Sequence, residues 1–294
     1  MIPTEIGPNG VAMIFPPMTS PMSRHETKTA QRQTKSFAAG VRESEAETWT
    51  VETDDMASKN AIFDAGMSTS VVTGAGSGIG RAVALALAGR GLDVALLGRT
   101  KATLDETALA IEALGRKSLV ATCDVSRADE VSEAARAVEA AWGAPRVVVS
   151  NAGVPGRPGL VVDTTEADWD AVIDANLKGT FLVARAFLPA MIARGRGRLV
   201  AIASISATLG TPRFAPYVAS KWGVVGLVKS LAEELRGTGL QALAVLPGSV
   251  DTPLLAVSGF APQMTADQVA GLVAYAALDA PDAMNASAIE MFGP

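Results

Sequence analysis

The fold is decided by the stretch Thr73-Gly74-Ala75-Gly76-Ser77-Gly78-Ile79-Gly80. A β-branched run over residues 70–73 precedes it and a helical pattern over 78–90 follows it, which is the context of a dinucleotide-binding turn. Gly74 permits the sharp turn, Gly78 lets the backbone approach a pyrophosphate, and Gly80 allows the helix to pack on the sheet. The free N–H groups of the helix start would face phosphate. A glycine-rich loop without a ligand is the alternative.

Short apolar runs alternate with longer helical stretches from residue 70 onward. The expected strands are 70–73, 93–97, 118–122, 146–150, 198–203, 241–246 and 287–292. The expected helices are 78–90, 101–115, 127–142, 166–194, 215–237 and 266–278. This alternation predicts an α/β fold: a Rossmann-type, doubly wound parallel sheet of about seven strands with helices on both faces, in one domain.

Residues 1–66 differ from the rest of the chain. A weakly basic stretch over 24–42 precedes an acidic one over 43–55, and apolar periodicity is poor. We expect an N-terminal extension that is disordered or weakly structured, ahead of a catalytic domain over 67–294. A targeting peptide fits the glutamates poorly. Translation from Met67, with the upstream segment an artefact of start-site choice, is the other alternative.

The composition argues against several classes of function. The formal net charge of −5 and the lack of basic runs with interleaved aromatics argue against nucleic-acid binding. The single cysteine, Cys123, fits a reducing, cytoplasmic location, and with one histidine in the chain we expect no metal site. No apolar run is long enough to span a bilayer, so no membrane partner is expected. The only histidine, His25, lies in the extension, so the folded part cannot use Ser-His-Asp chemistry.

Tyr217 and Lys221 offer proton chemistry without histidine. They stand four residues apart in the predicted helix 215–237, which places them on one face. A lysine ammonium near a phenol favours the phenolate, so we expect the pKa of Tyr217 to fall from about 10 toward neutrality. The tyrosine would then serve as a general acid or base. The alternative is a chance pair on an amphipathic helix.

The glycine spacing resembles that of a known family. Thr73 followed by Gly-x-x-x-Gly-x-Gly is similar to the single-domain form of the short-chain dehydrogenase/reductase family, and the resemblance runs from about residue 69 to the C-terminus. The extended members of the family, many of them sugar-nucleotide epimerases and dehydratases, show Gly-x-x-Gly-x-x-Gly and a longer C-terminal part. This chain shows neither feature, so an epimerase or dehydratase is disfavoured. The resemblance implies hydride transfer between a nicotinamide and an alcohol/carbonyl pair.

The resemblance implies four catalytic residues. Tyr217 would be the acid/base, and Lys221 would lower its pKa and bind ribose hydroxyls. Ser204, 13 residues before Tyr217, would hydrogen-bond the substrate oxygen, whereas the nearby Ser206 is out of register. Asn176 would hold a water for proton relay. Each residue also has a structural alternative, such as a capping or strand-end role.

The resemblance also implies the residues that would bind the cofactor. They are Thr73, Gly74, Gly76, Ser77, Gly78, Ile79, Gly80, Arg99, Asp124, Val125, Asn151, Ala152, Gly153, Tyr217, Lys221, Pro247, Gly248, Val250 and Thr252. Ser150 stands where the family usually has a second asparagine. Gly98 stands where an NAD-preferring site has an acid, and Arg99 could grip a 2′-phosphate, so NADP is favoured and NAD is the alternative.

The sequence indicates the substrate much less clearly than it indicates the type of reaction. We expect a small-molecule alcohol, ketone or aldehyde, beneath a short lid over 254–263. Acyl chains on a carrier protein are an alternative, as is a catalytically silent, dinucleotide-sensing regulator. The apolar helices 166–194 and 215–237 predict a homodimer or homotetramer.

Overall fold

A seven-stranded parallel sheet forms the centre of residues 68–294, the part of the chain that this computed structural model describes. All neighbouring strands pair in parallel, in the order β3-β2-β1-β4-β5-β6-β7. The strands are β1 (Thr69–Thr73), β2 (Asp93–Gly98), β3 (Ser118–Thr122), β4 (Val147–Ser150), β5 (Gly197–Ile202), β6 (Leu240–Pro247) and β7 (Ala288–Met291). The predicted Rossmann-type fold in one domain is confirmed. The extension predicted over 1–66 lies outside the described residues.

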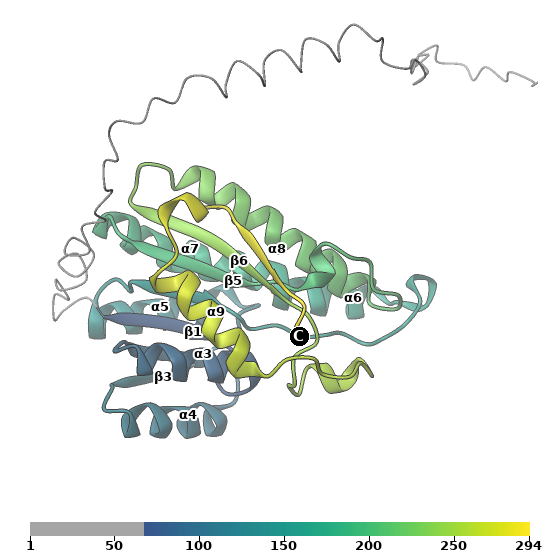
Figure 1. Ribbon diagram of the computed structural model, residues 1–294, viewed down its shortest axis with the longest axis horizontal. Coiled ribbons are helices and arrows are strands. Elements are labelled where there is room, and N and C mark those ends of the chain that lie inside the picture. The colour runs from purple at the N-terminus through teal and green to yellow at the C-terminus, as the bar shows by residue number, and fades with distance from the viewer. Residues whose placement is uncertain (1–67) are drawn as a thin grey trace, which may run out of the picture. The chain divides into compact units, whose positions relative to one another are not determined.

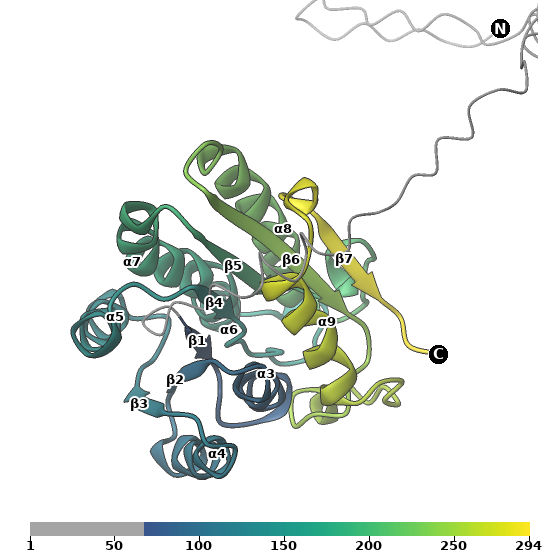
Figure 2. The ribbon, with the colours of Figure 1, turned by 60° about the vertical axis from the view of Figure 1, so that its left-hand side comes forward.

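Helices cover both faces of the sheet (Figures 1 and 2). One face carries α3 (Gly78–Gly89), α4 (Lys101–Ala113) and α9 (Ala266–Leu278), and the other carries α5 (Ala128–Trp142), α7 (Gly179–Arg194) and α8 (Ala215–Glu234). Each face has its own apolar core. Successive strand residues alternate between them, so Val71 packs with the α5–α7–α8 layer and Val72 with the α3–α4–α9 layer. A sheet buried on both faces explains why its strands are almost wholly apolar.

The strand order reverses between β1 and β4. The chain moves outward from β1 to β2 and β3, then crosses back to place β4 on the other side of β1. Loops that leave the carboxyl ends of such neighbouring strands run in opposite directions and open a crevice, where ligands bind in open α/β sheets. The glycine turn follows β1 and the Asn151 loop follows β4, so both lie at this point.

The predicted helix 166–194 is wrong in one respect, because it is interrupted. α6 (Glu166–Ile173) runs into a π-helical turn, Asp174–Lys178, before α7 begins. The buried Asn176 side chain sits in this turn and is bonded to the loop after β4. A local widening of the helix at a side chain committed to another element is typical of π turns, which recur at functional sites.

Within residues 68–294, no helix is both long and apolar enough to cross a bilayer. The same part of the chain holds no group of three or more acidic, histidine or cysteine side chains arranged for a metal ion. The cytoplasmic location stays a prediction.

Candidate active site

A cavity of about 580 Å³ opens at the carboxyl ends of the strands. Most of the residues singled out from the sequence line it: Gly74, Gly76, Ser77, Gly78, Ile79, Arg99, Asp124, Val125, Asn151, Ala152, Gly153, Ser204, Tyr217, Lys221, Pro247, Gly248, Val250 and Thr252. Three others, Thr73, Gly80 and Asn176, lie behind its wall. Loops more than 100 residues apart in the sequence thus meet around one space.

The glycine turn leaves no room for side chains. Gly74 and Gly78 adopt φ angles of +65° and +51°, which L side chains rarely take. A β-carbon on Gly80 would lie 2.2 Å from the Gly74 carbonyl oxygen and 2.5 Å from Nδ2 of Asn151. The start of α3 therefore packs directly against the turn, and the backbone of the glycines faces the cavity without covering side chains. This cradle fits the pyrophosphate of a dinucleotide.

Thr73 joins the two loops at the switch point rather than facing the cavity. Its Oγ1 accepts hydrogen bonds from the backbone N–H groups of Asn151 (2.9 Å) and Ala152 (3.0 Å), and its carbonyl accepts one from Nδ2 of Asn151 (2.9 Å). Thr107, which the sequence did not single out, donates from Oγ1 to the Ala75 carbonyl (3.1 Å) and anchors the turn from α4. Thr107 lies within an amphipathic helix, and nothing in the sequence around it predicts its contact with the glycine turn.

The carboxyl ends of β2 and β3 bring Arg99 and Asp124 to the same end of the cavity. Partial burial would raise the pKa of Asp124, but hydrogen bonds from Ser126 and the positive charges of Arg99 and Arg127 outweigh it and lower that pKa. Asp124 is therefore ionised at neutral pH. Cys123 also lines this end, and burial, with the charges of Glu130 and Asp124, raises its pKa to about 11, so its thiol stays protonated.

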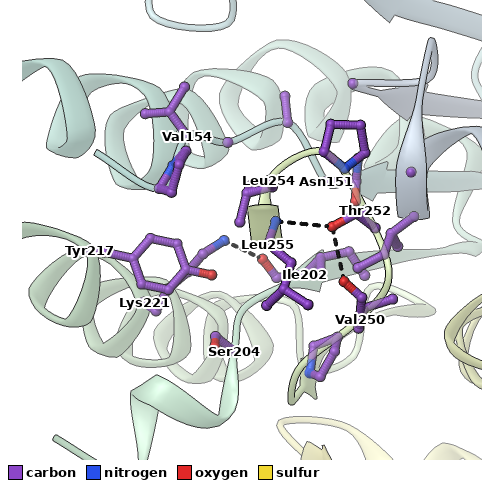
Figure 3. A pocket seen from close by; sticks show the side chains of 18 of the residues that line it. Asn151, Val154, Ile202, Ser204, Tyr217, Lys221, Val250, Thr252, Leu254 and Leu255 are labelled. Atoms are coloured by element: carbon purple, nitrogen blue, oxygen red, sulfur yellow. Dashed lines mark hydrogen bonds between the residues drawn. The ribbon is translucent and has the colours of Figure 1, made fainter. Parts of the chain in front are cut away.

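Tyr217, Lys221 and Ser204 lie together on one side of the cavity (Figure 3). Nζ of Lys221 donates to the Ile202 carbonyl (2.9 Å) and lies 5.6 Å from the centroid of the Tyr217 ring. The Ser204 side chain hydrogen-bonds Tyr217 and accepts a bond from the N–H of Ser206 (3.1 Å). The hydroxyl of Ser206 instead pairs with that of Thr211 (3.2 Å). Of the two serines, Ser204 is thus the one in contact with the tyrosine.

The expectation that Lys221 lowers the pKa of Tyr217 is wrong in this structure. Burial raises the pKa of Tyr217, and the hydrogen bond with Ser204 lowers it only in part. The ammonium group of Lys221 is directed to a backbone carbonyl, and burial lowers its own pKa to about 8. Desolvation disfavours the charged form of both side chains and outweighs their mutual influence.

Asn176 uses its side chain as a clamp. Its Oδ1 accepts from the N–H of Val154 (2.8 Å), and its Nδ2 donates to the Val154 carbonyl (3.0 Å) and to Oγ of Ser220 (3.0 Å). Both amide protons are thereby used. Its backbone carbonyl accepts from Oγ1 of Thr180 (2.8 Å), which in turn accepts from Oγ of Ser150 (3.2 Å). Ser150, where the family usually has asparagine, thus joins the network behind the wall.

The far end of the cavity is walled by apolar side chains from two segments. Leu209 and Phe214 lie between β5 and α8, and Leu254, Leu255 and Phe260 follow β6. Thr252 fixes the start of the second segment, because its Oγ1 donates to the Val250 carbonyl (3.1 Å) and accepts from the N–H of Leu255 (3.4 Å), as Figure 3 shows. Phe260 lies within the lid expected over 254–263, whereas Leu209 and Phe214 were not expected at the cavity. Phe214 stands three residues before Tyr217 at the start of a helix, and this proximity to a predicted catalytic residue could have placed it near the cavity.

Comparison with known families decides the assignment. The family model described as short chain dehydrogenase matches residues 68–260. The chain belongs to the short-chain dehydrogenase/reductase family. It is accordingly an NAD(P)-dependent oxidoreductase, in agreement with the prediction from the sequence.

Individual relatives of this short-chain dehydrogenase/reductase include reductases. A 3-oxoacyl-[acyl-carrier-protein] reductase FabG of Thermotoga maritima is 38% identical over 184 residues, 63% of this chain and 74% of the relative. A short-chain dehydrogenase/reductase of Armillaria gallica is 41% identical over 187 residues, 63% of this chain and 71% of the relative. Among solved structures, levodione reductase matches with a TM-score of 0.74 and 28% identity, over 76% of this chain and 96% of that one. A variant of actinorhodin polyketide ketoreductase with NADPH matches with a TM-score of 0.72 and 34% identity, over 77% of this chain and 96% of that one.

Proposed function

We propose that this enzyme reduces a ketone or aldehyde with NADPH, and that Tyr217 donates the proton to the carbonyl oxygen. The observation that carries the proposal is the contact between Tyr217 and Ser204, at a cavity whose opposite end is the glycine turn. The test is a screen of ketones, aldehydes and alcohols with each cofactor, followed by the absorbance of the reduced nicotinamide. Consumption of NADPH with ketones or aldehydes is the expected result, and its absence with all of them would refute the proposal.

The residues of the cavity suit a dinucleotide along its whole length. The turn from Gly74 to Gly78 and the start of α3 would hold the pyrophosphate, and Asp124 and Val125 would border the adenine. Lys221 would bind ribose hydroxyls, and the loop from Pro247 to Thr252 would hold the nicotinamide. When bound, the cofactor supplies the hydride.

The electrostatics of Tyr217 suit a proton donor. Because burial raises its pKa, the phenol keeps its proton at neutral pH and has one to donate. Ser204 would hydrogen-bond the substrate oxygen and stabilise the negative charge that develops there. Lys221, with a pKa of about 8, would exchange protons readily near neutrality and could restore the tyrosine proton. Asn176 would support this relay by fixing the wall behind it.

We propose NADPH rather than NADH because of Arg99. Its exposed guanidinium follows β2, where Gly98 leaves room and no acid is present to bind a ribose 2′-hydroxyl. Arg99→Gln is expected to lower the ratio of kcat/KM for NADPH to that for NADH by about ten- to a hundredfold, the worth of a charge-assisted hydrogen bond to phosphate. Arg136→Gln, an exposed arginine on α5 remote from the cavity, is the matched control. A wild-type preference for NADH, or an unchanged ratio in Arg99→Gln, would contradict the proposal.

We also propose a homodimer or homotetramer that uses α7 and α8. Large apolar side chains remain exposed on these helices, namely Phe181 and Ile192 on α7 and Trp222 on α8. Exposed apolar area of this kind on adjacent helices is typical of subunit contacts. Light scattering after size exclusion is expected to give at least twice the mass of one chain. A monomer across the working concentration range would contradict the proposal.

A second candidate substrate is a 3-oxoacyl group on a carrier protein. The identity to the FabG reductase favours it. A kcat/KM for the carrier-bound substrate well above that for the same acyl group on a small thiol would support it, and equal values would count against it.

A further inference from the structure

The two ends of the cavity differ in chemistry. Among residues 68–294, the charged side chains that line it are Arg99, Asp124 and Lys221. The first two lie at the ends of β2 and β3, toward one edge of the sheet, and Lys221 is buried and bonded to the Ile202 carbonyl. Beyond Ser204 and Tyr217, the wall is formed by residues between 205 and 214 and between 254 and 260, and none of those that line the cavity is charged. Arg213 belongs to the first segment, but it is exposed and does not line the cavity.

The hydroxyl groups of this uncharged part are already engaged. Ser206 and Thr211 hydrogen-bond each other (3.2 Å). Oγ of Ser258 donates to the Leu255 carbonyl (2.7 Å) and accepts from the N–H of Phe260 (3.1 Å). The wall therefore offers a ligand few polar groups apart from Ser204 and Tyr217, which lie at its inner end.

A pair of aromatic rings spans this part of the cavity. Phe214 is the residue before α8 and Phe260 comes from the segment after β6, yet their ring centroids lie 6.5 Å apart with the planes inclined by 38°. Phe214 is only 8% exposed, whereas Phe260 is 53% exposed. Leu209 and Leu254 also line the cavity while partly exposed to water. Large apolar side chains held at the mouth of a cavity mark it as a site for an apolar ligand.

We propose that this end of the cavity binds a neutral, ring-sized apolar group next to the substrate carbonyl, and that Phe260 covers this group against Phe214. The inference rests on the proposed function, because it places the reacting carbonyl at Tyr217 and Ser204. The substrate class is then neutral aryl or cycloalkyl ketones and their alcohols. Keto acids with a carboxylate beside the carbonyl are disfavoured, since the uncharged wall gives that carboxylate no partner.

The test compares three carbonyl compounds with NADPH and the full-length enzyme. Acetophenone has a ring and no charge, butanone has neither, and benzoylformate has the ring and a carboxylate. We expect kcat/KM to be highest for acetophenone. Phe260→Ala is expected to lower kcat/KM for acetophenone by about tenfold and that for butanone by less than about threefold, because only the ring loses its apolar contact. Phe260→Leu should recover most of the loss.

The matched control is Phe292→Ala. Phe292 is 52% exposed, like Phe260, but does not line the cavity, so its removal should leave all three values unchanged. Benzoylformate as the best substrate, or equal losses for acetophenone and butanone in Phe260→Ala, would overturn the inference. If the enzyme turns over none of the three compounds, binding is measured instead. Calorimetry should show acetophenone binding at least tenfold more weakly to Phe260→Ala than to wild type. Equal affinity for the two proteins, or no binding to the wild type, would overturn the inference independently of any turnover.

Discussion

Replacing Tyr217 by phenylalanine is expected to lower kcat by about a hundred- to ten-thousand-fold, the usual contribution of a positioned proton donor. The change removes one hydroxyl and keeps the ring. Tyr217 is partly buried, and Ser204 would keep its bond from the N–H of Ser206 after the phenol hydroxyl is lost, so the loss of stability should be small, about 1 kcal/mol. Binding of NADPH, followed by the quenching of tryptophan fluorescence, should be unchanged within about twofold because the glycine turn is untouched.

The chain provides its own control for this experiment. It has two tyrosines, and Tyr275 on α9 is partly exposed, with its hydroxyl 4.0 Å from the sulfur of Met284. Tyr275→Phe removes the same atom far from the cavity and should retain full turnover. A comparable loss of turnover in both variants would assign the effect to folding rather than to proton transfer.

Replacing Gly80 by alanine is expected to destabilise the protein by about 3 kcal/mol or more, because overpacking against rigid backbone leaves no easy relief. The added β-carbon would lie 2.2 Å from the Gly74 carbonyl oxygen, and both groups belong to the turn that begins α3. Relief would require α3 to move away from the turn. NADPH binding should therefore weaken together with stability, as measured by urea unfolding and by fluorescence titration.

Gly89 is the matched control, since it is the last residue of the same helix. A β-carbon there would meet nothing within 4 Å. Gly89→Ala should therefore be neutral or stabilise the protein by up to about 1 kcal/mol through the lower entropy of the unfolded chain. Similar effects at both positions would show that the contact between α3 and the turn is less tight than the structure indicates.

The sequence predicted the fold well because its signals are local. The alternation of β-branched runs with helical patterns sets the sheet, and the glycines after Thr73 set the first turn. Gly74 and Gly78 do take the left-handed backbone that only glycine adopts readily. The spacing of Ser204, Tyr217 and Lys221 placed three side chains on one cavity because the strand end and the helix face are fixed by the same local patterns.

What the sequence could not predict depends on contacts between distant segments. The direction of the Tyr217 pKa follows from its burial, and burial is set by the whole surrounding fold rather than by the lysine four residues away. The π-helical turn at Asn176 depends on the loop after β4, and the contact of Thr107 with the glycine turn depends on how α4 packs. Phe214 and Phe260 meet at the cavity because two segments far apart in the sequence fold together.

The central claim is that Tyr217 gives the proton while NADPH reduces a carbonyl. The most direct measurement is the rate of NADPH consumption with acetophenone by the full-length wild-type enzyme and by Tyr217→Phe, at equal and saturating cofactor. The account predicts measurable turnover in the wild type and a loss of at least about a hundredfold in the variant. Turnover in Tyr217→Phe within a few-fold of the wild type would contradict it.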